Sequence, residues 1–227
     1  MKWNLHKVTV PFSPSLSNAV NMAEMSQWRK DHPVKGYNDF YQETWDYERR
    51  YNLYEAIVKQ ENLAGEPIDY FEFGVAGGYS FKWWLQKNSL AASRFFGFDT
   101  FEGLPEKWGS YAKGSMAYSL ESLGIQDGRA GFYKGLFQDT LLPFLEQYDN
   151  RNRKLIHIDS DLFSSALFTM TQLYRFLKPG DILLFDEFAV PSHEFLAFKI
   201  FSESFYVKYD VIGAANNYLF VAIRITG

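Results

Sequence analysis

The sequence predicts an α/β protein with a doubly wound, mostly parallel, seven-stranded Rossmann-like sheet and an antiparallel last strand, preceded by an N-terminal helical extension. From residue 68 onward, short apolar runs alternate with amphipathic stretches, the pattern of repeated βα units. Most of these apolar runs end in an acidic residue. The last two runs are joined by a link too short for a parallel crossover. We therefore expect an extension over residues 1–63 and one α/β domain over residues 64–227.

Composition narrows the classes of function. The chain has 227 residues, a net charge of −4 and no sustained basic run, which argues against nucleic acid as a partner. It has no cysteine, which excludes disulfides and thiolate metal sites. The stretch Met1–Lys7 lacks the apolar run of a signal peptide, and no segment approaches the ~20 apolar residues of a membrane span. We expect a cytoplasmic protein that does not associate with a membrane.

The extension differs from the rest of the chain. Prolines 11, 14 and 33 interrupt it, and spacings of three and four predict helices over about 15–30 and 39–61. In the first helix, Leu16, Val20, Met22 and Trp28 can mostly share one side. These segments either pack on the sheet or form a lid over a substrate pocket.

The glycine-rich turn after the first strand is the centre of the predicted site. Residues 68–73 form an apolar run, glycines 74, 77 and 78 follow, and a helix is expected over 81–87. Glycines allow the backbone to approach a ligand closely, and the helix start offers free N–H groups. The carboxylate of Glu72 would repel a pyrophosphate but could hold a cationic amino group. The turn therefore suits S-adenosylmethionine (SAM) better than NAD.

The remaining units follow in order. Residues 94–98 form a second strand that ends at Asp99, 25 residues beyond Gly74, where an acidic residue often binds ribose but can also simply begin a turn. Residues 131–135 predict a third strand and 139–148 a helix. A fourth strand over 154–161 ends in Asp159 and Asp161, and an amphipathic helix over 163–177 follows. A fifth strand over 182–185 ends in Asp186 and Glu187, and strands over 205–212 and 218–225 form a closing hairpin.

Five sequence motifs together resemble class I SAM-dependent methyltransferases, most closely the macrocin O-methyltransferase-like group, which methylates sugar hydroxyls of natural products. The motifs span roughly residues 50–225 and read Glu-Phe-Gly-Val-Ala-Gly-Gly, Gly-Phe-Asp-Thr-Phe-Glu-Gly-Leu-Pro, Ile-Asp-Ser-Asp-Leu-Phe, Leu-Lys-Pro-Gly-Asp and Leu-Phe-Asp-Glu. The resemblance implies that the methionine part of SAM is surrounded by Glu72, Gly74, Ala76, Gly77 and Ser80, and that Asp99 binds its ribose. Two features depart from the group: the last acidic pair is Asp-Glu where the group usually has Asp-Asp, and the N-terminal segment has no counterpart.

Methyl transfer to a neutral hydroxyl requires either a base or a cation that lowers the pKa of the hydroxyl. Asp159, Asp186 and Glu187 are hard oxygen ligands at neighbouring strand ends, a set that Mg²⁺ or a similar ion prefers. Without a cation, the same residues would only begin loops and cap helices. Asp161 could act as base, ligand or helix cap. His193 could reach the site as a base or be merely exposed, and His157 is expected to be a core histidine.

The predicted function is therefore SAM-dependent O-methyl transfer to a small hydroxylated acceptor, a sugar or another vicinal diol, assisted by a divalent metal. The catalytic candidates are Asp159, Asp161 and His193. The alternatives are a non-catalytic SAM- or nucleotide-binding module and an NAD-dependent oxidoreductase. Glu72 and the sequence Gly-Val-Ala-Gly-Gly, in place of Gly-x-Gly-x-x-Gly, disfavour the oxidoreductase. A homo-oligomer is left open.

Overall fold

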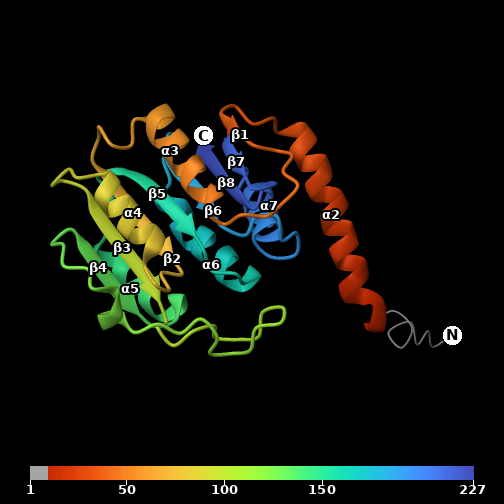
Figure 1. Cartoon of the computed structure of the whole chain (residues 1–227), viewed down its shortest axis with the longest axis horizontal. Coiled ribbons are helices and arrows are strands. Elements are labelled where there is room, and N and C mark those ends of the chain that lie inside the picture. The colour runs from red at the N-terminus through yellow and green to blue at the C-terminus, as the bar shows by residue number, and fades with distance from the viewer. Residues whose placement is uncertain (1–9) are drawn as a thin grey trace.

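A computed structural model describes residues 10–227, so the first nine residues of the extension, including Met1–Lys7, lie outside the described residues. Eight strands form one sheet in the order β1-β7-β8-β6-β5-β2-β3-β4 (Figure 1). The last strand in sequence, β8, is antiparallel to both of its neighbours, whereas the other strand pairs are parallel. The strands are β1 (Tyr37–Asn38), β2 (Ile68–Phe73), β3 (Arg94–Asp99), β4 (Ala130–Lys134), β5 (Arg153–Ile158), β6 (Ile182–Phe185), β7 (Tyr209–Ala215) and β8 (Phe220–Ile225).

This topology confirms the predicted class, a mostly parallel Rossmann-like sheet with a reversed last strand. The sheet has one strand more than the predicted seven. The additional strand, β1, has two residues and pairs with β7 at the sheet edge. So short a strand leaves no alternating pattern in the sequence.

Helices cover both faces of the sheet. One apolar core joins the sheet to α3 (Arg49–Glu61) and α4 (Tyr79–Lys87). A second core, on the other face, joins it to α2 (Ser13–Asp31), α5 (Phe137–Gln147), α6 (Phe163–Leu173) and α7 (Glu194–Ser204). Short 3₁₀ turns occur at η1 (Val10–Phe12), η2 (Leu120–Leu123) and η3 (Tyr174–Phe176). Within residues 10–227, no helix is both long and apolar enough to cross a bilayer.

The structure differs from the expected boundaries in several places, since β5 ends at Ile158 instead of 161 and α6 at Leu173 instead of 177. The helix expected from residue 39 begins at Arg49, because the preceding backbone is held by side chains of the β7–β8 turn. Asn217 accepts a hydrogen bond from the Gln42 amide at 2.8 Å, and Asn216 accepts one from the Asp46 amide at 3.0 Å. Strand β7 begins at residue 209 rather than 205, because α7 continues to Ser204.

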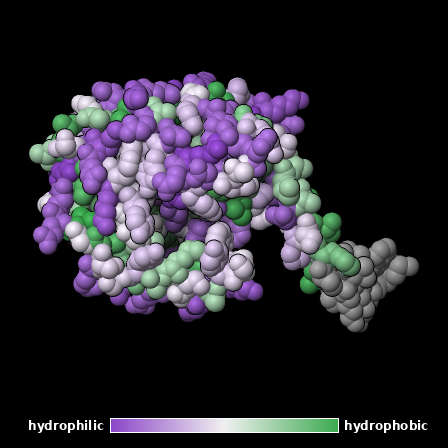
Figure 2. All heavy atoms as spheres, in the orientation of Figure 1, coloured by the Kyte–Doolittle hydropathy of each residue, from purple (hydrophilic) through white to green (hydrophobic). Residues whose placement is uncertain are grey.

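Helix α2 extends away from the body of the molecule (Figure 1), and its N-terminal half carries apolar side chains on the surface (Figure 2). Leu16, Val20 and Met22 are more than half exposed. The buried apolar residues are instead Met25 and Trp28, near the C-terminal end of the helix. Trp28 is therefore buried, whereas the other apolar residues expected on the same side of the helix are exposed.

Candidate active site

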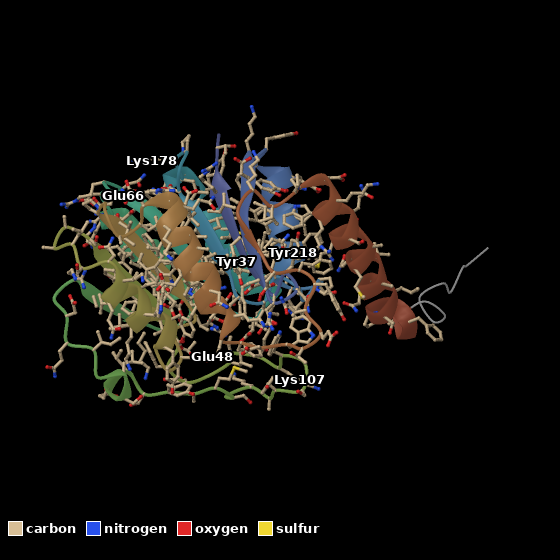
Figure 3. The ribbon with its side chains drawn as sticks, turned by 45° about the horizontal axis from the view of Figure 1, so that its top comes forward. Tyr37, Glu48, Glu66, Lys107, Lys178 and Tyr218 are labelled. Atoms are coloured by element: carbon tan, nitrogen blue, oxygen red, sulfur yellow. The ribbon has the colours of Figure 1, made fainter. Side chains whose placement is uncertain are left out.

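A cavity of about 610 Å³ opens at the carboxyl ends of the parallel strands. In Figure 3, Glu48 and Lys107 mark this end of the molecule, and Glu66 and Lys178, which precede β2 and β6, lie at the opposite end. Ligands in open α/β sheets bind at the carboxyl ends of the strands. The volume lies in the range typical of small-molecule sites.

The glycine turn after β2 forms one wall of the cavity. Gly74 and Ala76 line it, and both have positive φ angles, 98° and 44°. A side chain at Gly74 could not be accommodated, because a Cβ there would lie 1.7 Å from the carbonyl oxygen of Asp159. Gly74 therefore permits the end of β2 to pass directly against the end of β5.

Asp99 also lines the cavity, and it holds the turn in shape. Its carboxylate accepts hydrogen bonds from the amides of Val75, Ala76 and Phe101 at 2.8, 2.9 and 2.6 Å. Asp99 thus stabilises the turn, which is one of the two roles expected from the sequence. A carboxylate has about four lone-pair sites, so three such bonds leave acceptor capacity for a ligand hydroxyl.

Three of the residues expected around SAM do not line the cavity: Glu72, Gly77 and Ser80. Glu72 is fully buried, and its oxygens accept hydrogen bonds from Ser80 at 2.6 Å and Tyr70 at 2.5 Å. Burial raises the pKa of Glu72 well above its usual value, although both hydroxyl donors oppose this rise. Contact between Glu72 and SAM stays a prediction.

Four carboxyl groups meet on the cavity wall beside the glycine turn: Asp159 and Asp161 after β5, and Asp186 and Glu187 after β6. Burial, followed by repulsion from Asp186, raises the pKa of Asp159 to about 7 and that of Glu187 to about 8. Burial and then Asp159 raise the pKa of Asp161 to about 7. Burial raises the pKa of Asp186 to about 6 against the opposing effect of Arg50. The cluster therefore has more negative charge than the protein neutralises.

Arg50, in the first turn of α3, is the only cationic side chain among the described residues that line the cavity. Its guanidinium lies 3.1 Å from Oδ2 of Asp186 and 3.9 Å from Oδ2 of Asp159. Tyr47 lines the same wall and donates a hydrogen bond to Glu187 at 3.4 Å. The sequence analysis identified neither residue, because more than 100 positions separate them from the acids they contact.

The two histidines lie on different sides of the cluster. His157 is fully buried in β5 beneath the cavity, with Nε2 3.6 Å from Oδ1 of Asp186. Burial lowers its pKa to about 4, so the ring is neutral. His193 precedes α7 and does not line the cavity, although its ring lies 6.3 Å from that of Trp108. Burial lowers the pKa of His193 as well.

The long connection between β3 and β4 forms the outer wall of the cavity. Trp108, Tyr111 and Met116 from this connection line the cavity, and the rings of Trp108 and Tyr111 stack at 5.5 Å. Irregular segments with aromatic side chains carry no periodic signal in a sequence. The contribution of this loop was therefore not predicted.

The residues present fit a divalent cation and SAM. Oδ1 of Asp186 is buried without a hydrogen-bond partner, and ligand atoms of His157, Asp159 and Asp186 lie within 4.8 Å of one another. An unpaired buried carboxylate oxygen is costly unless a cation satisfies it. The excess of acids likewise favours a cationic sulfonium beside the glycine turn.

Three structures of known proteins share the fold. NovP, an O-methyltransferase, is 19% identical with a TM-score of 0.60, covering 94% of this chain and 99% of NovP. CalS11, a calicheamicin methyltransferase, is 16% identical with a TM-score of 0.61, covering 92% of each chain. A Mg-SAM structure of cmcI is 13% identical with a TM-score of 0.50, covering 89% of this chain and 96% of cmcI. No curated protein matches the chain by sequence.

The family described as Methyltransferase domain, Methyltransf_24, matches residues 71–188, more than half of the chain. The matched segment begins within β2 and ends just after Glu187, so it contains the glycine turn and all four clustered carboxyl groups. The predicted class I methyltransferase is thus confirmed at the level of family and fold, and the chain belongs to this family of methyltransferase domains.

Proposed function

We propose that this protein is a SAM-dependent O-methyltransferase that acts on a hydroxyl of a small molecule, a sugar or another vicinal diol, with the help of a divalent cation. The observation that carries the proposal is that one cavity, of about 610 Å³, is lined by both the glycine turn and the four-carboxyl cluster. NovP and CalS11 are methyltransferases of the same fold, which supports the reaction type.

The chemistry divides between the glycine turn and the neighbouring acidic cluster. SAM, when bound, supplies a methyl group on a sulfonium, and a divalent ion, when bound, lowers the pKa of the attacking hydroxyl. Asp159, Asp186 and Glu187 would hold the ion. As the new O–C bond forms and the S–C bond breaks, the hydroxyl proton passes to a carboxylate.

Asp161 is the residue that we assign as this base. It lines the cavity, and burial brings its pKa to about 7, close to the value at which a general base works best near neutral pH. Its backbone has a φ of 59°, a conformation that is uncommon outside glycine and often found at functional sites. His193 does not line the cavity, which favours Asp161 between the two candidates.

The extension contributes to the acceptor side through its last part. Tyr47 and Arg50 line the cavity next to the acids, whereas no residue of α2 does. We propose that residues 39–50, together with the loop that carries Trp108, cover the acceptor. Self-association stays a prediction, to be measured by light scattering of the purified protein.

Binding and turnover test the proposal separately. We expect SAM to bind in calorimetry, and we expect Asp159→Asn or Asp186→Asn to lower methyl transfer at least ~100-fold while SAM still binds, because the glycine turn and Asp99 hold the cofactor without these two carboxylates. Chelator should have the same effect, reversed by adding a divalent ion.

Absence of SAM binding by the folded protein would refute the proposal. Unchanged biological activity in both Asn variants, with SAM bound, would instead identify a non-catalytic binding module. Full turnover in chelator would refute the metal and leave deprotonation to Asp161 alone.

A further inference from the structure

The outer wall of the cavity is held in a fixed shape by its own backbone. Residues 103–116, here called the aromatic hairpin, fold back on themselves. The Leu104 amide donates to the Ser115 carbonyl oxygen at 2.9 Å, and the amides of Trp108 and Tyr111 each donate to the carbonyl oxygen of the other, at 3.0 and 2.8 Å. The rings of Trp108 and Tyr111 are nearly parallel, with 16° between their planes. The cavity therefore has aromatic faces in a defined arrangement on its acceptor side.

The acids that line the cavity exceed what the two ligands of the proposed function would neutralise. Among the described residues, six acidic side chains line the cavity and Arg50 is the one cationic side chain that does. Lys107 and Lys113 of the aromatic hairpin do not line it. A divalent ion supplies two positive charges, and SAM supplies one net positive charge, so the formal charge of the filled lining is still negative. A partly buried site of this kind attracts a cation and repels an anion.

The aromatic hairpin meets the acidic cluster. The Trp108 ring lies 6.3 Å from the ring of His193, the residue just before α7. The next residue, Glu194, accepts a hydrogen bond from the Glu187 amide at 2.9 Å. On the hairpin itself, Glu106 lines the cavity two residues before Trp108. Aromatic faces and carboxylates therefore line the same part of the cavity.

A buried hydroxyl in the cluster also has no partner among the described residues. Ser160, between Asp159 and Asp161, lines the cavity and is 9% exposed, and its Oγ forms no hydrogen bond. Buried polar groups are normally paired, so this hydroxyl indicates a ligand. An ammonium group has three N–H donors and no acceptor, and it can donate to a hydroxyl oxygen and to carboxylates together.

We propose that the methyl acceptor carries a protonated amine, as an amino sugar does, and that the aromatic hairpin and the neighbouring acids bind this ammonium group. The inference rests on the proposed function and narrows its acceptor to a cationic, hydroxylated ring. The face of an aromatic ring attracts an ammonium group, and carboxylates beside it add to the attraction. An ammonium nitrogen has no lone pair, so the hydroxyl remains the nucleophile and the reaction is still O-methyl transfer.

Two series of probes, which differ mainly in charge, test the proposal in calorimetry. The full-length protein is first loaded with a divalent ion and S-adenosylhomocysteine. One series is dopamine, ethylcatechol and dihydroxyphenylacetate, and the other is glucosamine, glucose and glucuronate. We expect the amine in each series to bind at least ~10-fold more tightly than the anion. The second series checks that the order follows charge and not the kind of ring.

Glu106→Gln should lower the ratio of amine to anion affinity at least ~3-fold, because it removes a charge from the aromatic hairpin. Glu102→Gln is the matched control. Glu102 is 75% exposed, pairs with Lys134 at 3.3 Å and does not line the cavity, so the same change of charge should keep the ratio. Trp108→Leu should weaken dopamine more than ethylcatechol, and Trp108→Phe should restore most of the loss, since phenylalanine keeps an aromatic face.

The wild-type measurement decides the inference without any variant. Equal or tighter binding of the anions, or a lack of binding by both amines, would overturn it. Methyl transfer to a neutral diol by a protein that binds SAM would then leave the proposed function intact. A failure to bind SAM in the loading titration would refute the proposed function itself, so the two failures are distinguishable.

Discussion

At the scale of single residues, Arg50 has the strongest electrostatic role in the cavity. Its guanidinium is only 18% exposed and lies 3.1 Å from the carboxylate of Asp186 and 3.9 Å from that of Asp159. Removing one partner of a buried ion pair typically costs ~3–5 kcal/mol, because the remaining charge has no compensation. We expect Arg50→Met to lower the free energy of unfolding by about 3 kcal/mol without a divalent ion, and by less when one is bound. Denaturant titration at pH 7 measures both values.

Arg49→Met is the matched control. Arg49 is adjacent in sequence and 23% exposed, but it faces one carboxylate, Asp39, at 3.4 Å. We expect this variant to lose less than half as much stability. Equal losses for the two variants would show that the acidic cluster does not depend on Arg50.

The acidic half of the site could be predicted at this scale, and the cationic half could not. Asp159, Asp186 and Glu187 each end an apolar run, so the rule for ligand sites in parallel sheets places them together. Arg50 lies within an unremarkable polar and aromatic stretch, and its contacts exist only in the folded chain. The burial of Glu72 could not be predicted from the sequence either, because it depends on the contacts of its carboxylate with Tyr70 and Ser80 in the folded chain.

At the scale of elements, the strands from residue 68 onward were predicted because each contains a short apolar run, and most helices because they are amphipathic, but no range was predicted for α7. The exceptions are segments held by long-range contacts. Residues 39–48 have helical spacing, yet Asn216 and Asn217 hold their backbone as a loop. In the first helix, Leu16 and Val20 remain exposed, whereas Asn18 and Asn21 form hydrogen bonds with Ser192, so polar and not apolar side chains face the body there.

Helix α2 therefore has two parts that can be tested separately. Trp28 is 8% exposed, packs against Phe188 at 5.0 Å and Phe195 at 5.9 Å, and donates a hydrogen bond to Tyr209 at 2.8 Å. Trp28→Ala should cost about 3 kcal/mol of stability, at the lower end of the range for buried tryptophan. Deleting residues 1–17 removes the exposed N-terminal turns and should change neither the melting temperature nor SAM affinity.

Thermal unfolding and calorimetry of both variants measure these effects. A shorter chain with normal SAM affinity but reduced acceptor turnover would support the idea that the extension forms a lid. Loss of stability on deletion would contradict the division of α2 into a buried and an exposed part.

At the scale of the whole molecule, the acidic cluster makes stability depend on pH. In the folded, metal-free protein the pKa values of Asp159, Asp161 and Glu187 are raised to about 7, 7 and 8, while aspartate and glutamate in the unfolded chain titrate near 4. Between these values the native state binds more protons than the unfolded state. The free energy of unfolding must therefore fall as pH rises from about 4 to about 8.

His157 opposes this trend over part of the range. Its pKa is lowered to about 4 in the folded state, so below pH ~6.5 the unfolded chain binds the additional proton and stability rises with pH. With Asp186, whose pKa is raised to about 6, four raised carboxyl groups outweigh one lowered histidine, which leaves a net decline. We expect the melting temperature in chelator to fall steadily from pH 5 to pH 8.

A bound divalent ion should remove most of this decline, because it stabilises the ionised carboxylates that are otherwise unfavourable. Melting curves at several pH values, with chelator and with a saturating divalent ion, measure the difference. Asp161→Asn should make the decline in chelator shallower, since one raised carboxyl group is gone. A melting temperature that is flat or rises between pH 5 and pH 8 in chelator would show that the four acids are neutralised within the protein itself, which would remove the electrostatic reason for a cation in this cavity.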